Sequence, residues 1–168
     1  MYPDLRPLLI TLAAALAPCA HAGSVEVNYD ARATFTDAGT TPAERERHLA
    51  ALAGHLKRLG ERRLVEGSRL SVELVDLDLT GTLRPSRRTA QDLRVVTGRA
   101  DGPHIELRYT LSDASQVLAS GRETLFDASL PRVGDARNSD GGDPLRHEKS
   151  LLDHWFEARI ASAPAATR

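Results

Sequence analysis

The sequence has little cysteine, few aromatic residues and no excess of charge of either sign. A single cysteine, Cys19, among 168 residues excludes an internal disulfide and a cluster of cysteine ligands for a metal. Aromatic residues make up 4% of the chain, so its core must consist mainly of leucine, valine and alanine. The net charge of −1 gives no electrostatic reason to expect a nucleic acid as partner.

The chain also lacks an apolar run long enough to span a bilayer. Its longest, Leu8–Ala17, has about ten residues, whereas a transmembrane helix needs roughly 20. The run is followed by Ala20-His21-Ala22, the small-x-small pattern of signal peptidase sites. We therefore expect residues 1–22 to be a signal peptide cleaved between Ala22 and Gly23. Residues 23–168 would form one periplasmic domain without a transmembrane segment.

A lipid anchor is an alternative to simple cleavage. Leu16-Ala17-Pro18-Cys19 resembles a lipoprotein processing box, in which Cys19 would be lipidated and become the first residue. Pro18 stands where such boxes have Gly, Ala or Ser. In this alternative the protein is an envelope scaffold anchored through Cys19.

Two elements are predicted in the first third of the expected domain. Alternation of Val25, Val27 and Tyr29 predicts a strand over 24–29. Thr41-Pro42-Ala43-Glu44 combines a capping box with proline at the first helical position, and leucines at helical spacing follow. This pattern predicts a helix over residues 42 to about 63, unless Gly60 ends it early.

Residues 69–79 are predicted to form a strand with an irregularity. Their apolar alternation changes face between Leu74 and Val75. A β-bulge there would restore one inner face and leave Asp76 and Asp78 pointing outward. Without a bulge the two carboxylates would face the core, which is unfavourable unless they are paired or bind something. We favour the bulge because buried carboxylate pairs are rare.

Alternating and turn-forming residues predict the remaining elements. These are a short strand over 93–97, a hairpin of strands 104–111 and 116–126, an exposed loop over 127–142, and a helix opened by Asp143-Pro144. The order strand, helix, four strands, helix predicts an α+β fold. We expect a mainly antiparallel sheet of about five strands with two helices packed on one face.

Four segments carry a resemblance to a known family. They are Asp76-Leu77-Asp78-Leu79-Thr80-Gly81, Asp92-Leu93-Arg94-Val95, Pro103-His104-Ile105-Glu106-Leu107-Arg108-Tyr109 and Glu148-Lys149-Ser150-Leu151-Leu152-Asp153-His154-Trp155-Phe156. Together they resemble an uncharacterised family of secreted bacterial proteins, catalogued as domain of unknown function family 3016. The resemblance implies export and a single compact domain, and it implies no activity or site.

Asp76 and Asp78 are the sharpest candidate for chemistry. With Thr80 they resemble the first motif of haloacid-dehalogenase-type phosphatases, in which one Asp attacks phosphorus and the other is acid/base around Mg²⁺. That fold needs βα units after the motif, whereas strands are predicted here. A metal-dependent hydrolase using Asp76 and Asp78 is therefore the alternative function.

The histidines and one aromatic pair are further candidates for a functional site. His48 and His55 lie two helical turns apart, as do His147 and His154, too far to share a metal, so we expect solvated surface histidines and no metal site. Trp155-Phe156 is interpreted as a core anchor, with a partner-binding edge as the alternative.

The favoured hypothesis is an exported, non-catalytic envelope domain. It would bind an envelope protein or a small molecule through its sheet or the loop over 127–142. The candidate binding residues are Asp76, Asp78, Trp155 and Phe156. No complete catalytic set and no cofactor motif occurs in the sequence, so neither is assigned.

Overall fold

The computed structural model describes residues 23–30, 32–85, 92–96, 101–127 and 143–162. The expected leader over 1–22, with Cys19 and Ala22, and almost all of the expected loop over 127–142 lie outside the described residues. None of the described helices is both long enough and apolar enough to cross a membrane.

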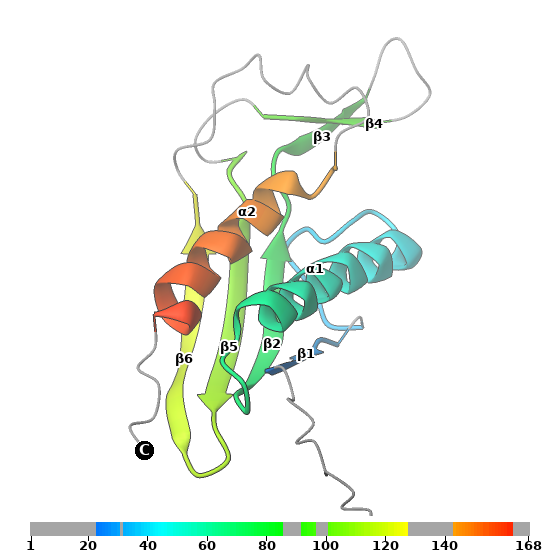
Figure 1. Cartoon of the computed structure of the whole chain (residues 1–168). Coiled ribbons are helices and arrows are strands. Elements are labelled where there is room, and N and C mark those ends of the chain that lie inside the picture. The colour runs from blue at the N-terminus through cyan, green and yellow to red at the C-terminus, as the bar shows by residue number, and fades with distance from the viewer. Residues whose placement is uncertain (1–22, 31, 86–91, 97–100, 128–142, 163–168) are drawn as a thin grey trace, which may run out of the picture.

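The described elements form an α+β fold, as the sequence predicts. They are β1 (Ser24–Asn28), α1 (Pro42–Arg63), β2 (Arg69–Asp78), β3 (Thr82–Pro85), β4 (Asp92–Val95), β5 (His104–Ser112), β6 (Val117–Phe126), α2 (Arg146–Trp155) and the π-helical turn η3 (Phe156–Ala161). Strands β1-β2-β5-β6 form one sheet in that order, and β3 and β4 form a separate two-stranded ribbon. Both helices lie on one face of the sheet, and the ribbon stands beyond its end (Figure 1).

The sheet differs from the prediction in two details. Its pairs β2-β5 and β5-β6 are antiparallel, but β1 runs parallel to β2. Helix α1 connects β1 to β2 and returns the chain to the end of the sheet at which β1 began. Two parallel neighbouring strands need such a crossover connection. The second detail is that the strand predicted over 93–97 belongs to the ribbon as β4, which leaves four strands in the main sheet.

Helix α1 starts as its sequence predicts. The Oγ1 of Thr41 accepts a hydrogen bond from the backbone N–H of Glu44 at 3.1 Å. The Glu44 carboxylate accepts from the N–H of Thr40 at 2.9 Å and from its hydroxyl at 2.7 Å, and these bonds lower the pKa of Glu44. The capping box therefore reaches back one residue further than the usual pattern.

The helix passes through Gly60 and ends at Arg63, so Gly60 does not cap it. The glycine allows a close approach instead, because a Cβ at position 60 would lie 1.9 Å from Cγ2 of Val25. Strand β1 thus packs directly on the last turns of α1.

Helix α2 begins at Arg146, after a turn, and not at Pro144 as predicted. The Oδ1 of Asp143 accepts from the N–H of Leu145 at 3.0 Å, and its backbone oxygen accepts from the N–H of Arg146 at 3.2 Å. Asp143 therefore closes the turn that leads into the helix.

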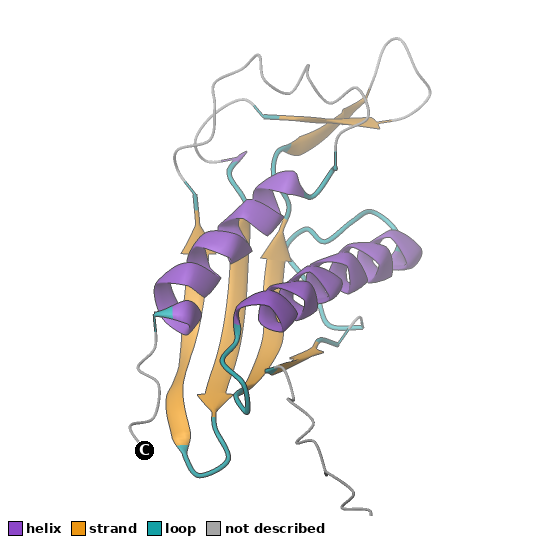
Figure 2. Cartoon of the chain, in the orientation of Figure 1, coloured by secondary structure: helices purple, strands orange, loops and turns teal. Residues whose placement is uncertain are grey.

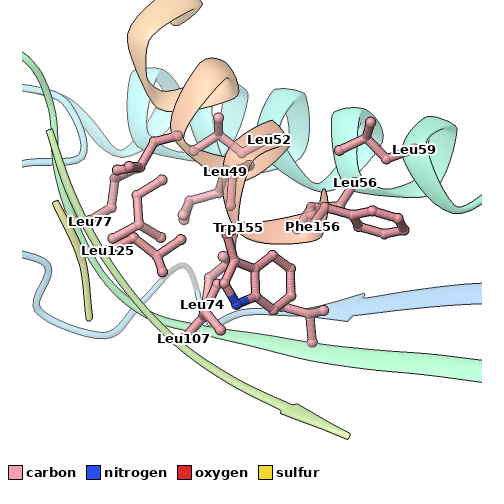
Figure 3. Packing of buried hydrophobic residues seen from close by; sticks show 14 of the residues in the cluster. Leu49, Leu52, Leu56, Leu59, Leu74, Leu77, Leu107, Leu125, Trp155 and Phe156 are labelled. Atoms are coloured by element: carbon pink, nitrogen blue, oxygen red, sulfur yellow. The ribbon is translucent and has the colours of Figure 1, made fainter. Parts of the chain in front are cut away.

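The core lies between the helices and the sheet (Figure 3). Trp155 and Phe156 are 4% and 0% exposed, and the Trp155 ring meets Tyr109 edge-on at 5.4 Å. Both aromatic side chains thus occupy the position expected of core anchors, and neither forms an exposed edge.

The bulge predicted in β2 is confirmed. The pairing of β2 with β5 shifts between Leu74 and Asp76. Leu74 and Leu77, three residues apart, are consequently both buried against the helices. Asp76 and Asp78 point to the opposite face, where each is half-buried.

Candidate functional site

Both helices lie on the same face of the sheet (Figure 2). The face turned away from them, here called the open face, is polar. Its exposed side chains include Arg69, Glu73, Thr110, Arg122 and Thr124. Cross-strand ion pairs join Arg108 to Glu73, at 2.9 Å, and Arg122 to Glu106. Among the described residues no helix covers this face. The open face therefore carries mixed charge that is largely paired within the sheet.

One row of four side chains crosses the open face at the end nearest the ribbon. Asp37 pairs with Asp78, Asp78 with His104, and His104 with Phe126. We call these four residues the end row. The rings of His104 and Phe126 are stacked at 4.3 Å, and Phe126 is 43% exposed. Aspartate, imidazole and an exposed ring thus lie side by side.

Asp76, next to the end row, has a structural role. Its Oδ1 accepts from the N–H groups of Thr36 at 2.7 Å and Leu77 at 2.8 Å, and its Oδ2 accepts from the Thr36 hydroxyl at 2.6 Å. These three bonds fasten the segment before α1 to the bulge in β2. They also occupy the carboxylate, which leaves little capacity for a ligand.

Asp78 lacks such donors within the described part of the chain. Its nearest ionisable neighbour is His104, whose Nδ1 lies 3.9 Å from Oδ2, beyond hydrogen-bond range. That Nδ1 is itself buried and makes no hydrogen bond to a described residue. Burial raises the pKa of Asp78, and the negative charges of Asp37 and Asp76 add to this, against the opposing effects of His104 and Arg94. Asp78 is therefore a partly desolvated carboxylate that accepts no hydrogen bond from a described residue and has His104 within ion-pair range.

Asp37, in contrast, is neutralised by Arg94 of β4. The Nη2 of Arg94 donates to Oδ1 of Asp37 at 2.9 Å, and its Nη1 donates to the backbone oxygen of Gly81 at 2.9 Å. One guanidinium thus connects the ribbon to the end row.

Glu148 is 1% exposed and is not one of the residues that the sequence analysis singled out. Its Oε1 accepts from the N–H and the hydroxyl of Thr80, at 2.7 and 2.8 Å, while Oε2 makes no hydrogen bond to a described residue. Glutamate in the first turn of a helix usually binds its own cap. Here it holds the end of β2 to α2, a pairing that no local pattern could reveal.

The expectation of solvated histidines is wrong for His55. Its side chain is 15% exposed, and its Nε2 lies 2.6 Å from Oδ1 of Asp153, so it ties α1 to α2. The Nδ1 of His48 lies 2.8 Å from the backbone oxygen of Ala38. Burial lowers the pKa of His147. The described residues include no group of three or more His, Cys, Asp or Glu side chains able to hold a metal.

Asp76 and Asp78 do not form the pair that a phosphatase would need. They lie at the carboxyl end of β2, after a parallel β1-α1-β2 unit, which is where such a motif would lie. The next neighbour of β2 is antiparallel, however, and β3 rather than a helix follows the motif. The three hydrogen bonds that Asp76 accepts account for its position through a structural role, with no need for a catalytic one.

The chain matches a known protein family over most of its length. A family model described as "Protein of unknown function (DUF3016)" matches residues 23–158. Neither the curated proteins nor the solved structures gave a match. The matched region includes the end row, Arg94 and Glu148.

Proposed function

Because the chain belongs to a family of unknown function, DUF3016, its membership supplies no activity, and we propose one from the site. The protein is a non-catalytic binding domain of the bacterial envelope that holds a partner protein at the end row of its open face. The observation that carries this proposal is the half-buried carboxylate of Asp78, which accepts no hydrogen bond from a described residue, in the same row as the exposed ring of Phe126.

These two groups define the chemistry of the partner. A donor or cation placed on Asp78 would make a charge-assisted hydrogen bond, which contributes about 1.5–3 kcal/mol. An apolar group placed on Phe126 would remove exposed ring surface from water, at about 25 cal/mol per Å². The partner should therefore present a basic or hydrogen-bonding side chain beside an apolar one.

A protein suits this surface better than a small molecule. Small ligands bind in concave sites that enclose most of their surface. The end row instead extends across three strands of the sheet and the segment that contains Asp37. The paired charges beyond the row would then form the polar rim of an interface.

Export is supported by the leader-like pattern of residues 1–22 and by the start of the family match at residue 23, directly after the expected cleavage site. Cleavage before Gly23 would leave the matched region as the mature domain. Lipidation at Cys19 would tether the same domain to a membrane, and the mass of the mature N-terminus distinguishes the two.

Site-specific crosslinking in cells tests the binding function. A photo-crosslinking residue at position 124, exposed on the open face, should give an adduct of defined mass, whereas one at the exposed Lys57 of α1 should not. Asp78→Asn and Phe126→Ala should each reduce the yield of that adduct. Equal adducts from both positions, or a yield that neither substitution changes, would refute the proposal.

A further inference from the structure

The β3-β4 ribbon is too small to be stable without support. Its four residue pairs run from Thr82–Val95 to Pro85–Asp92, and neither strand joins the main sheet. An isolated two-stranded hairpin is marginally stable at best in water. The order of the ribbon must therefore come from its attachment to the rest of the molecule.

The chain leaves the body of the protein at a defined point. Thr80 is fixed to the buried Glu148 of α2 by two hydrogen bonds. The next residue, Gly81, has φ +79°, which favours glycine, and its N–H donates to the oxygen of Asp101 at 2.8 Å. The backbone is thus anchored up to Thr80 and changes direction at Gly81, where a hinge would lie.

Beyond this hinge, Arg94 attaches the ribbon to the end row. Its two bonds reach Gly81 and Asp37, and both Arg94 and Asp37 are more than two-thirds buried, with side chains 25% and 30% exposed. Charge-assisted bonds in such a setting are stronger than neutral ones and are screened less than surface pairs. The same pair also neutralises Asp37, so that Asp78 is the carboxylate of the row without a close arginine partner.

We propose that Arg94 is a latch that docks the β3-β4 ribbon beside the end row through its ion pair with Asp37. The ribbon is then a unit that can undock while the four-stranded sheet stays folded. For the binding site this inference rests on the proposed function: a partner that places its own cation on Asp37 would displace Arg94 and release the ribbon.

Amide hydrogen exchange on the purified protein tests the latch. The variants are Arg94→Gln and Asp37→Asn; the second keeps an oxygen for the bond from the N–H of Gly39. The matched control is Glu73→Gln, which removes one charge from the Arg108 pair of equal length on the same face. Both latch variants should speed exchange in β3 and β4 by about 10-fold to 100-fold relative to the wild type, and the control should not.

The exchange pattern decides the outcome. Faster exchange confined to the ribbon, with β2 and β5 unchanged, supports the latch. Wild-type rates in the ribbon of both variants would overturn it, and so would β2 and β5 accelerating in step with the ribbon. No partner is needed, so a failure of the crosslinking experiment would refute the binding function alone.

Discussion

The contact between Gly60 of α1 and Val25 of β1 makes an unusual prediction for a glycine-to-alanine change. A Cβ at position 60 would lie 1.9 Å from Cγ2 of Val25 and 3.2 Å from its Cβ, so the Val25 side chain, the strand or the helix must shift. Gly54 lies in the same helix, and a Cβ there would meet only Nη1 of Arg58, at 3.4 Å. The two positions therefore offer the same substitution with and without a clash.

The two substitutions should differ in their effect on the free energy of unfolding. Alanine in place of glycine inside a helix stabilises by about 1 kcal/mol, which is the result expected for Gly54→Ala. At Gly60 the same gain is set against an overpacking cost of about 1–3 kcal/mol. Gly60→Ala should therefore be less stable than Gly54→Ala by about 1–3 kcal/mol.

Urea denaturation of both variants measures this difference as a change in midpoint at constant slope. A second step removes the clashing methyl group: Val25→Ala should cost less in the Gly60→Ala background than in the wild type. Equal stabilisation by Gly54→Ala and Gly60→Ala would refute the packing of β1 on α1, and with it the parallel edge of the sheet.

Three further predictions concern the polar contacts. The folded-state pKa of Asp78 is raised, so its contribution to stability is present below the unfolded pKa and is lost as pH rises through the folded pKa. Asp78→Asn should thus raise the melting temperature at neutral pH, and this gain should vanish below about pH 4. A gain that persists in acid would contradict the raised pKa of Asp78. Thr80→Val removes the hydroxyl donor from buried Glu148 and should destabilise the fold by about 1.5–3 kcal/mol in urea, whereas Thr80→Ser should not. A double-mutant cycle between His55 and Asp153 should give a coupling of about 0.5–1 kcal/mol, because Asp153 is 47% exposed. Zero coupling would show that this contact does not hold α1 to α2.

Sequence patterns predicted the structural features that depend only on residues close together in the chain. Thr41 and Pro42 mark the start of α1, and the break in alternation between Leu74 and Val75 marks the bulge in β2. Each signal is complete within a few residues, so no knowledge of tertiary structure was needed.

Pairing between distant segments could not be predicted in this way. The alternation of Val25 and Val27 identifies a strand but contains no information on its partner or direction. The sequence predicted β4 of the ribbon but not β3, because a proline such as Pro85 disfavours a strand.

The candidate site also combines features that depend on neighbouring residues with features that depend on residues distant in the sequence. Asp76 and Asp78 were found as a pair, and the bulge correctly placed them on the outer face. Their different surroundings depend on Thr36, Asp37 and Arg94, which are distant in sequence. The partial burial of the Asp78 carboxylate therefore depends on tertiary structure, as does the burial of Glu148.

The central claim, that a partner covers the open face, can be measured by thiol labelling. Cys19 is the only cysteine in the sequence, so a Cys19→Ser background gives each introduced cysteine a unique signal. Thr124→Cys reports on the open face and Lys57→Cys on the outer side of α1, where both native residues are exposed. A membrane-impermeant maleimide is applied to intact cells and to the purified protein.

The account predicts that Lys57→Cys reacts at the same rate in cells and in the purified protein. Thr124→Cys should react more slowly in cells, and Asp78→Asn should restore its rate. Equal rates at Thr124→Cys in cells and in the purified protein would contradict an occupied open face. Absence of labelling at Lys57→Cys until the cells are lysed would contradict export.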